Sequence, residues 1–155
     1  MSIELVNLLI QYEKTIARFY SVCAKKFPEE VKFWSKLSKE EEKHALILEK
    51  VNEKVDNSNI FLNDTRLKIQ PLRKSIEYAE EVTLKVERGE LNLLSALSIA
   101  DAIETSIIES AYYKIFEGKS IKFSNFLEQV QNESVAHRSK VREKLISVRR
   151  ESNLS

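Results

Sequence analysis

Apolar residues recur at alternating steps of three and four along four long stretches of this 155-residue chain. Such steps place side chains on one face of an α-helix, so each stretch predicts an amphipathic helix with one buried face. The chain has only two glycines and two prolines, which leaves few places where such helices would end. We therefore expect an all-α fold built from long helices that pack on one another.

Ionisable side chains interrupt each of the four predicted buried faces. Every face carries one glutamate, and the only two histidines lie one helical turn after the glutamates of the second and fourth faces. Burying such groups without compensation is costly, so something must neutralise them. The interrupting residues are Glu13, Glu41, His44, Glu104, Glu133 and His137.

A shared metal centre would compensate these groups. Four carboxylates and two imidazoles from four helices are the ligands expected of a di-iron or di-manganese site in a four-helix bundle. The two Glu-to-His spacings alone would both arise by chance with a probability of about 7 %, so the glutamates on the other two faces strengthen the case. Carboxylate and imidazole ligands without a thiolate favour iron or manganese over a structural zinc. We expect two iron ions, with manganese or a mixed pair as the alternative.

Helix-ending signals divide the chain. Long helices are predicted over about residues 2–26, 29–55, 93–117 and 121–151, with a shorter helix from about Pro71 to Gly89 and Asn92 as an N-cap. Short connections make the first and second long helices, and the third and fourth, antiparallel neighbours. The roughly 35 residues between the second and third allow a crossover along the bundle. The prediction is a single domain over residues 1–155 with a ferritin-like antiparallel four-helix bundle.

Charge and cysteine content exclude several classes of protein. The formal net charge is +1, and Lys and Glu are interspersed, so neither nucleic acid nor a membrane is an expected partner. The single cysteine, Cys23, excludes an internal disulfide and is expected to be a packing residue in a reducing compartment. No secretory signal is recognisable, so we expect a cytoplasmic protein. A homodimer is the default expectation for its assembly.

At these residues the chain resembles the rubrerythrin branch of the ferritin-like superfamily. The likeness rests on Glu13 followed by Tyr20 in EKTIARFY, on the EEEKHA segment, on Glu104 followed by Tyr112, and on the late His137. It covers residues from about 5 to 148, and its most specific element is the Glu-x-x-His spacing of the second helix. The resemblance implies a di-iron centre that reacts with hydrogen peroxide or dioxygen, as a peroxidase or ferroxidase.

The chain departs from the pattern of that family at three points. Ser134 occupies the position three before His137, and the nearest carboxylate is Glu133, which remains on the same helical face. Ile107 stands where rubrerythrins carry a second glutamate on the third helix. The chain lacks the four cysteines of a rubredoxin domain, so electrons are expected to come from a separate donor protein.

Three functions remain open from the sequence: a di-iron oxidoreductase, an iron-storing or iron-buffering protein, and a metal-free helical interaction module whose buried groups pair with one another. Buried ion pairs seldom stabilise a fold, which counts against the third. Asp101 is a candidate to accept a hydrogen bond from a ligating histidine, and a partly solvated aspartate without such a role is the alternative. The hydroxyls of Tyr20 and Tyr112 are candidates to lie near the metals, although packing alone would also account for both residues.

Overall fold

The computed structural model describes residues 2–55, 60–62, 66–110, 116–118 and 121–154. Five α-helices make up most of this part of the chain, which confirms the prediction that the fold is mainly α-helical. They are α1 (Ser2–Lys26), α2 (Val31–Val55), α3 (Arg66–Glu87), α4 (Leu93–Ser110) and α5 (Ile121–Leu154), and a short 3-10 turn, η1 (Pro28–Glu30), leads into α2.

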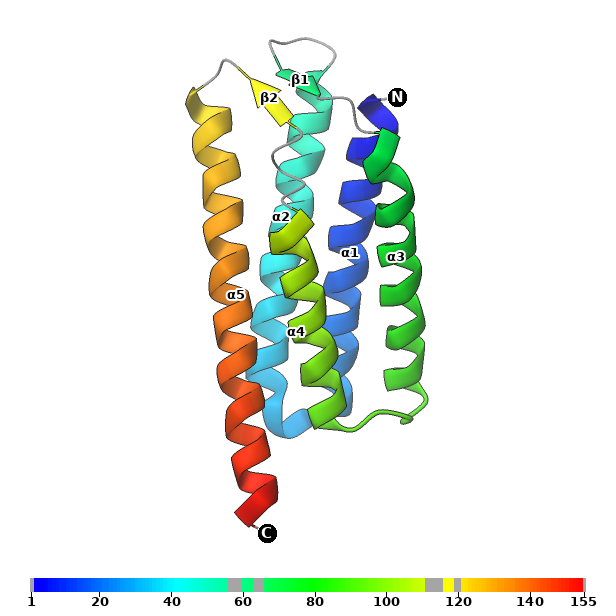
Figure 1. The fold of residues 1–155 in the computed structure, drawn as a ribbon, viewed down its shortest axis with the longest axis vertical. Helices are drawn as coiled ribbons and strands as arrows, with labels where there is room; N and C mark the ends of the chain where they lie inside the picture. The colour runs from blue at the N-terminus through cyan, green and yellow to red at the C-terminus, as the bar shows by residue number, and fades with distance from the viewer. Residues whose placement is uncertain (1, 56–59, 63–65, 111–115, 119–120, 155) are drawn as a thin grey trace.

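The helices form a bundle in which α1 packs on α2, α4 packs on α5, and α3 lies along the outer side of α1 (Figure 1). Both predicted antiparallel pairs, α1 with α2 and α4 with α5, are present. Helix α3 carries the chain back along the full length of the bundle, so α2 and α4 run in the same direction (Figure 1). The predicted crossover is therefore helical over most of its length.

Helix ends follow the signals in the sequence at three turns. Phe27 precedes a proline and leaves helical geometry, with φ −121° and ψ 71°, which separates α1 from η1. Gly89 has φ +72° directly after α3, the left-handed conformation that glycine adopts without strain. The side chain of Asn92 accepts a hydrogen bond of 2.8 Å from the backbone N–H of Ser95 and so caps α4.

Two predicted boundaries are wrong. Helix α3 has 22 residues and begins at Arg66, so Pro71 lies inside it instead of starting it. A proline this close to the first turn removes a single intrahelical hydrogen bond, which the rest of a long helix tolerates. The described part of α4 reaches Ser110, and residues 116–118 form a strand, so the helix predicted to about residue 117 does not extend that far.

A short antiparallel ribbon lies at one end of the bundle and accounts for part of the second difference. Strand β1 (Ile60–Leu62) pairs with β2 (Phe116–Gly118) in the register Ile60 with Gly118 and Leu62 with Phe116 (Figure 1). The ribbon draws residues 116–118 out of the helix predicted for them, because strand pairing uses the backbone groups that a helix would use. It joins the connection after α2 to the connection before α5.

The core consists mainly of the apolar faces predicted from the sequence. Fully buried residues with the largest side chains include Trp34, Tyr20 and Phe19, and Cys23 is buried beside them as a packing residue. Several residues of the predicted faces and one candidate tyrosine lie outside the part of the chain whose side chains are described: Leu5, Val51, Val55, Ile107, Ile108, Ala111, Tyr112, Ile115 and Phe126.

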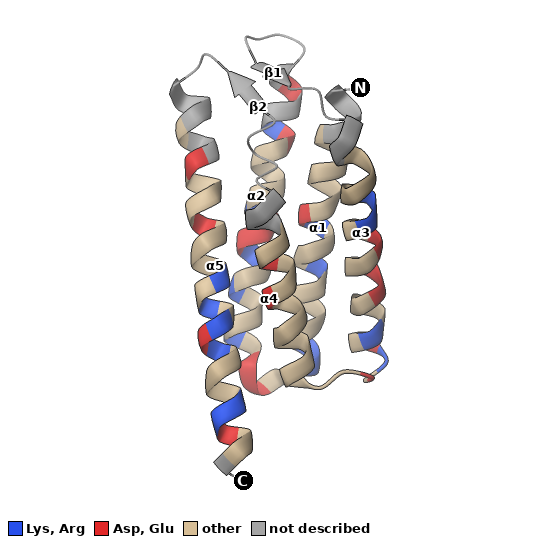
Figure 2. Cartoon of the chain, in the orientation of Figure 1, with Lys and Arg blue, Asp and Glu red and all other residues tan. Residues whose placement is uncertain are grey.

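Charges of both signs lie along α1, α2, α3 and α5, whereas α4 carries no lysine or arginine (Figure 2). Among the described helices, none combines the length and the apolar character that crossing a membrane requires.

Candidate metal centre

Five of the six predicted ligands come together in the middle of the bundle. They are buried to 0–2 % exposure although each is ionisable, and every helix except α3 supplies at least one of them. The set is Glu13 from α1, Glu41 and His44 from α2, Glu104 from α4, and His137 from α5.

These five residues form two groups that share one member. In the first group, ligand atoms of Glu13, Glu41 and His44 lie within 4.8 Å of one another. In the second group, ligand atoms of Glu41, Glu104 and His137 do the same. Each group therefore offers two carboxylates and one imidazole, and Glu41 belongs to both.

The two carboxylate oxygens of Glu41 face different histidines. Oε2 lies 3.3 Å from Nδ1 of His44, and Oε1 lies 3.1 Å from Nδ1 of His137. The two imidazole rings are stacked, with their centroids 5.8 Å apart and their planes inclined by 24°. Glu41 thus has the position of a bridge that offers one oxygen to each side of the centre.

The structure places Glu133 outside both groups. Its Oε2 lies 2.5 Å from Nε2 of His44, the ring nitrogen that faces away from Glu41. Its side chain is 32 % exposed, whereas the side chains of the two groups are almost fully buried. The geometry thus places Glu133 beside His44 and apart from the two groups, and its role as a metal ligand stays a prediction.

Glu40 is a member of this centre that sequence reasoning missed. Its Oε2 is in contact with Nε2 of His137, which is again the ring nitrogen that faces away from Glu41. The available signal was spacing, because Glu40 precedes His44 by four residues, as Glu133 precedes His137.

Of the two alternatives for Asp101, the structure supports the partly solvated side chain. Its carboxylate accepts a hydrogen bond of 2.7 Å from Nε of Arg142, and Nη2 of the same arginine contacts the Thr105 hydroxyl. This bond joins α4 to α5 on the outside of the bundle, and the pair is well exposed. Asp101 thus pairs with a nearby cation and contacts neither histidine.

Two buried tyrosines of α1 lie at the centre. The Tyr20 hydroxyl donates a hydrogen bond of 2.5 Å to Oε1 of Glu104, which agrees with the alternative that it lies near the site. Burial first, and then the neighbouring carboxylates, raise the pKa of both Tyr12 and Tyr20. Both hydroxyls therefore stay protonated. Tyr112, the other candidate, lies outside the described residues.

The pKa values of two buried carboxylates, Glu41 and Glu104, shift in opposite directions. Burial works to raise the pKa of Glu41, but hydrogen bonds from Glu13, His137 and His44 outweigh it and hold that pKa below its usual range. Burial and the negative charge of Glu41 together raise the pKa of Glu104 to about 8. The shared carboxylate is therefore charged at neutral pH, whereas Glu104 retains a proton until a cation replaces it.

Both histidines are basic in this setting. Burial opposes their charged forms, but hydrogen bonds and charge interactions with the surrounding glutamates dominate and raise the pKa of His44, and that of His137 to about 9. Without a metal, a protonated His137 therefore compensates the carboxylates at neutral pH, and the same contacts favour the protonated form of His44. A metal would displace these protons, since only neutral imidazole binds a cation.

The donor set fits a pair of cations. Among the described residues, Oε2 of Glu104 is buried without a hydrogen-bond partner, so the pairing of these groups with one another does not satisfy this oxygen. Both groups consist of carboxylate oxygen and imidazole nitrogen, ligands suited to iron and manganese. The buried thiol of Cys23 belongs to neither group.

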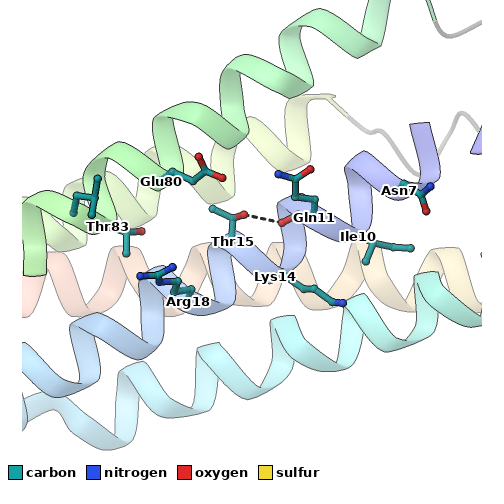
Figure 3. A pocket seen from close by; sticks show the side chains of 9 residues that line it. Asn7, Ile10, Gln11, Lys14, Thr15, Arg18, Glu80 and Thr83 are labelled. Atoms are coloured by element: carbon teal, nitrogen blue, oxygen red, sulfur yellow. Dashed lines mark hydrogen bonds between the residues drawn. The ribbon is translucent and has the colours of Figure 1, made fainter. Parts of the chain in front are cut away.

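A surface cleft of about 640 Å³ lies elsewhere, between α1 and α3 (Figure 3). Its two cations already have partners, because Lys14 pairs with Glu49 at 2.7 Å and Arg18 pairs with Glu87 at 3.2 Å. We place no site in this cleft. Its lining residues are Asn7, Ile10, Gln11, Lys14, Thr15, Arg18, Glu80, Thr83 and Leu84.

Comparisons with protein-family models, curated proteins and solved structures find no match to this chain. The arrangement of buried glutamates and histidines therefore carries the argument about function.

Proposed function

We propose that the protein is a di-metal carboxylate protein of the ferritin-like, rubrerythrin-like type that uses two iron ions to reduce hydrogen peroxide or dioxygen. The observation that carries this proposal is the position of Glu41, whose two oxygens face the two buried Glu/His groups. A carboxylate in that position can bridge two cations that lie close together. Such a pair needs ligands from several helices at one level of a bundle, which is how these residues are arranged.

The five buried residues would be distributed between the two ions. Glu13 and His44 would hold one ion, Glu104 and His137 the other, and Glu41 both. When bound, two iron ions can together supply two electrons, which with two protons taken up from solvent would convert hydrogen peroxide to two waters. An outside donor must return those electrons, because the chain has one cysteine and therefore no second electron-carrying site of the four-cysteine type.

Burial supports chemistry of this kind. The ligand side chains are almost fully excluded from water, which strengthens their interaction with a cation and limits the access of other reactants. Tyr20 would hold Glu104 in place through the 2.5 Å hydrogen bond to Oε1, which leaves Oε2 free to face an ion. Both the burial of the ligands and the Tyr20–Glu104 hydrogen bond are features of the chain itself and do not require a bound metal.

The test is the metal content of the purified protein after loading with ferrous iron without oxygen. We expect about two iron ions per chain. Addition of hydrogen peroxide should then oxidise both, and Mössbauer spectroscopy should show two magnetically coupled ferric ions. Glu42→Ala is the matched control, because Glu42 is an exposed neighbour of Glu41 on α2 and should retain both ions. A parent protein that binds no iron under these conditions would refute the proposal and favour a metal-free helical module.

A further inference from the structure

Each histidine of the centre contacts a glutamate on the opposite helix, α5 for His44 and α2 for His137. Nε2 of His44, on α2, lies 2.5 Å from Glu133 on α5. Nε2 of His137, on α5, contacts Glu40 on α2. Each glutamate also lies four residues before the histidine of its own helix, so the arrangement is reciprocal. A spacing of four brings each glutamate to the same side of the helix as its histidine, where it reaches the opposite helix.

We propose that Glu40 and Glu133 are positioning residues, which orient His137 and His44 so that Nδ1 of each ring faces a metal ion. This inference rests on the proposed function, because it assigns a role to two side chains that face the ligands from outside. Neither glutamate belongs to either group of candidate ligands.

The physical reason lies in the two nitrogens of imidazole. A neutral ring carries hydrogen on one nitrogen and a lone pair on the other. A carboxylate beside Nε2 holds the hydrogen there, because it can only accept a hydrogen bond. The lone pair then stays on Nδ1, which lies 3.3 Å from Glu41 in His44 and 3.1 Å from Glu41 in His137. Metal-binding histidines commonly donate their other N–H to a carboxylate in this way.

Exposure separates these two glutamates from the ligands. Their side chains are 29 % and 32 % exposed, whereas the ligand side chains are almost fully buried. The side-chain amide of Gln129 also donates a hydrogen bond of 3.0 Å to Oε1 of Glu133, which directs Oε2 toward His44. Glu133 is thus held at the outer edge of the centre, where its two oxygens already have partners.

The experiment measures ferrous iron binding, without oxygen, to the full-length protein and to paired variants. Glu40→Ala and Glu133→Ala should each weaken binding of one of the two ions by about 10- to 100-fold. Both should still bind two ions at saturating metal, because no ligand has been removed. Glu40→Gln and Glu133→Gln should keep affinity close to that of the parent, because the amide oxygen can accept the hydrogen bond from Nε2. Glu42→Ala and Glu128→Ala are matched controls on exposed positions of the same helices and should match the parent.

A second measurement reads the rings directly. The chain has two histidines, so nitrogen-15 NMR of the zinc-loaded protein gives two sets of ring signals. Both rings should show zinc on Nδ1 and hydrogen on Nε2, and each alanine variant should disturb only the histidine that lost its partner. These signals separate a positioning role from a general loss of stability.

The possible results are distinct. Zinc on Nε2, or alanine variants with the affinity of the parent, would overturn the positioning role while leaving the metal centre intact. Loss of one ion from Glu133→Gln at saturating metal would overturn it too, because Glu133 would then be a ligand. A parent protein that binds no metal would instead overturn the proposed function, and the inference with it.

Discussion

Helices α2 and α5 face each other across the centre with nearly the same sequence pattern but unequal roles. Helix α2 carries Glu40, Glu41 and His44, and α5 carries Glu133 and His137 at the positions that match the first and last of these. The middle position of α5 is Ser134. The difference shows that the shared carboxylate comes from one side of the bundle only.

The serine is too short to replace that carboxylate. Its hydroxyl is buried and donates a hydrogen bond of 3.0 Å to the backbone carbonyl of Val130, one turn earlier on the same helix. The described hydrogen bond of Ser134 therefore stays within α5. A centre with a bridge from a single helix depends on that residue, so the two helices should respond differently to substitution.

The largest expected effect comes from Glu41→Ala. Because both groups contain Glu41, its removal leaves each with one carboxylate and one imidazole, too few to hold an ion firmly. Iron content should fall from about two ions per chain to near zero, as measured by elemental analysis after anaerobic loading. Retention of even one tightly bound ion would mean that the two groups do not depend on a common ligand.

The sequence was sufficient to predict that five ionisable residues are buried and lie close together, because an ionisable residue within an apolar face is visible without a structure. The same reasoning could not show whether Glu133 would join the two groups. A spacing of four keeps a glutamate on the face of its histidine, and whether it points at a metal or at a ring nitrogen depends on the distance between helices. Glu40 was missed because the adjacent Glu41 already completes the steps of three and four on the predicted face, although Glu40 also precedes His44 by four residues.

The fold shows the same division between local and long-range information. The ends of α1 and the cap of α4 depend on neighbouring residues such as Pro28 and Asn92, and the sequence predicted them. The ribbon of β1 and β2 joins residues more than fifty positions apart, as in the pairing of Ile60 with Gly118. No local pattern specifies such a pairing, so residues 116–118 were assigned to a helix.

Metal removal should reveal the proton balance of the centre. The folded-state pKa of Glu104 is about 8 against 4.5 for the free side chain, and that of His137 is about 9 against 6.5. Both values are raised, so the folded metal-free protein holds more protons than the unfolded chain between these limits. Its stability should therefore fall as pH rises from the pKa of each group in the unfolded chain to its pKa in the folded protein.

We expect the Tm of the chelator-treated protein to drop by roughly 5 °C or more between pH 6 and pH 9.5, by differential scanning calorimetry. The iron-loaded protein should show a higher Tm at neutral pH, because cations neutralise the buried carboxylates and bind only the folded chain. Its Tm should also depend less on pH. Equal Tm values for the two forms across this range would indicate that the groups are compensated in some other way.

A smaller effect is expected from Tyr20→Phe, which tests a contact that joins the two sides of the bundle. The substitution removes the donor of the 2.5 Å hydrogen bond to Glu104 and leaves a second oxygen of that buried carboxyl without a partner. We expect a loss of about 1–2 kcal/mol in the free energy of unfolding of the metal-free protein, measured by urea denaturation. Tyr78→Phe, at an exposed position of α3, is the control and should change little.

The smallest expected effect is the most direct test of the inequality between α2 and α5. Ser134→Ala removes a hydroxyl whose described hydrogen bond stays within its own helix, and alanine favours helix more than serine does. The free energy of unfolding should change by less than about 0.5 kcal/mol, and the stoichiometry and affinity for ferrous iron should equal those of the parent. Urea denaturation and anaerobic iron titration measure the two quantities. A clear loss of iron affinity in Ser134→Ala would place the hydroxyl among the groups that hold the metals. In that case both α2 and α5 would contribute a central ligand, and the inference that only α2 does so, through Glu41, would be wrong.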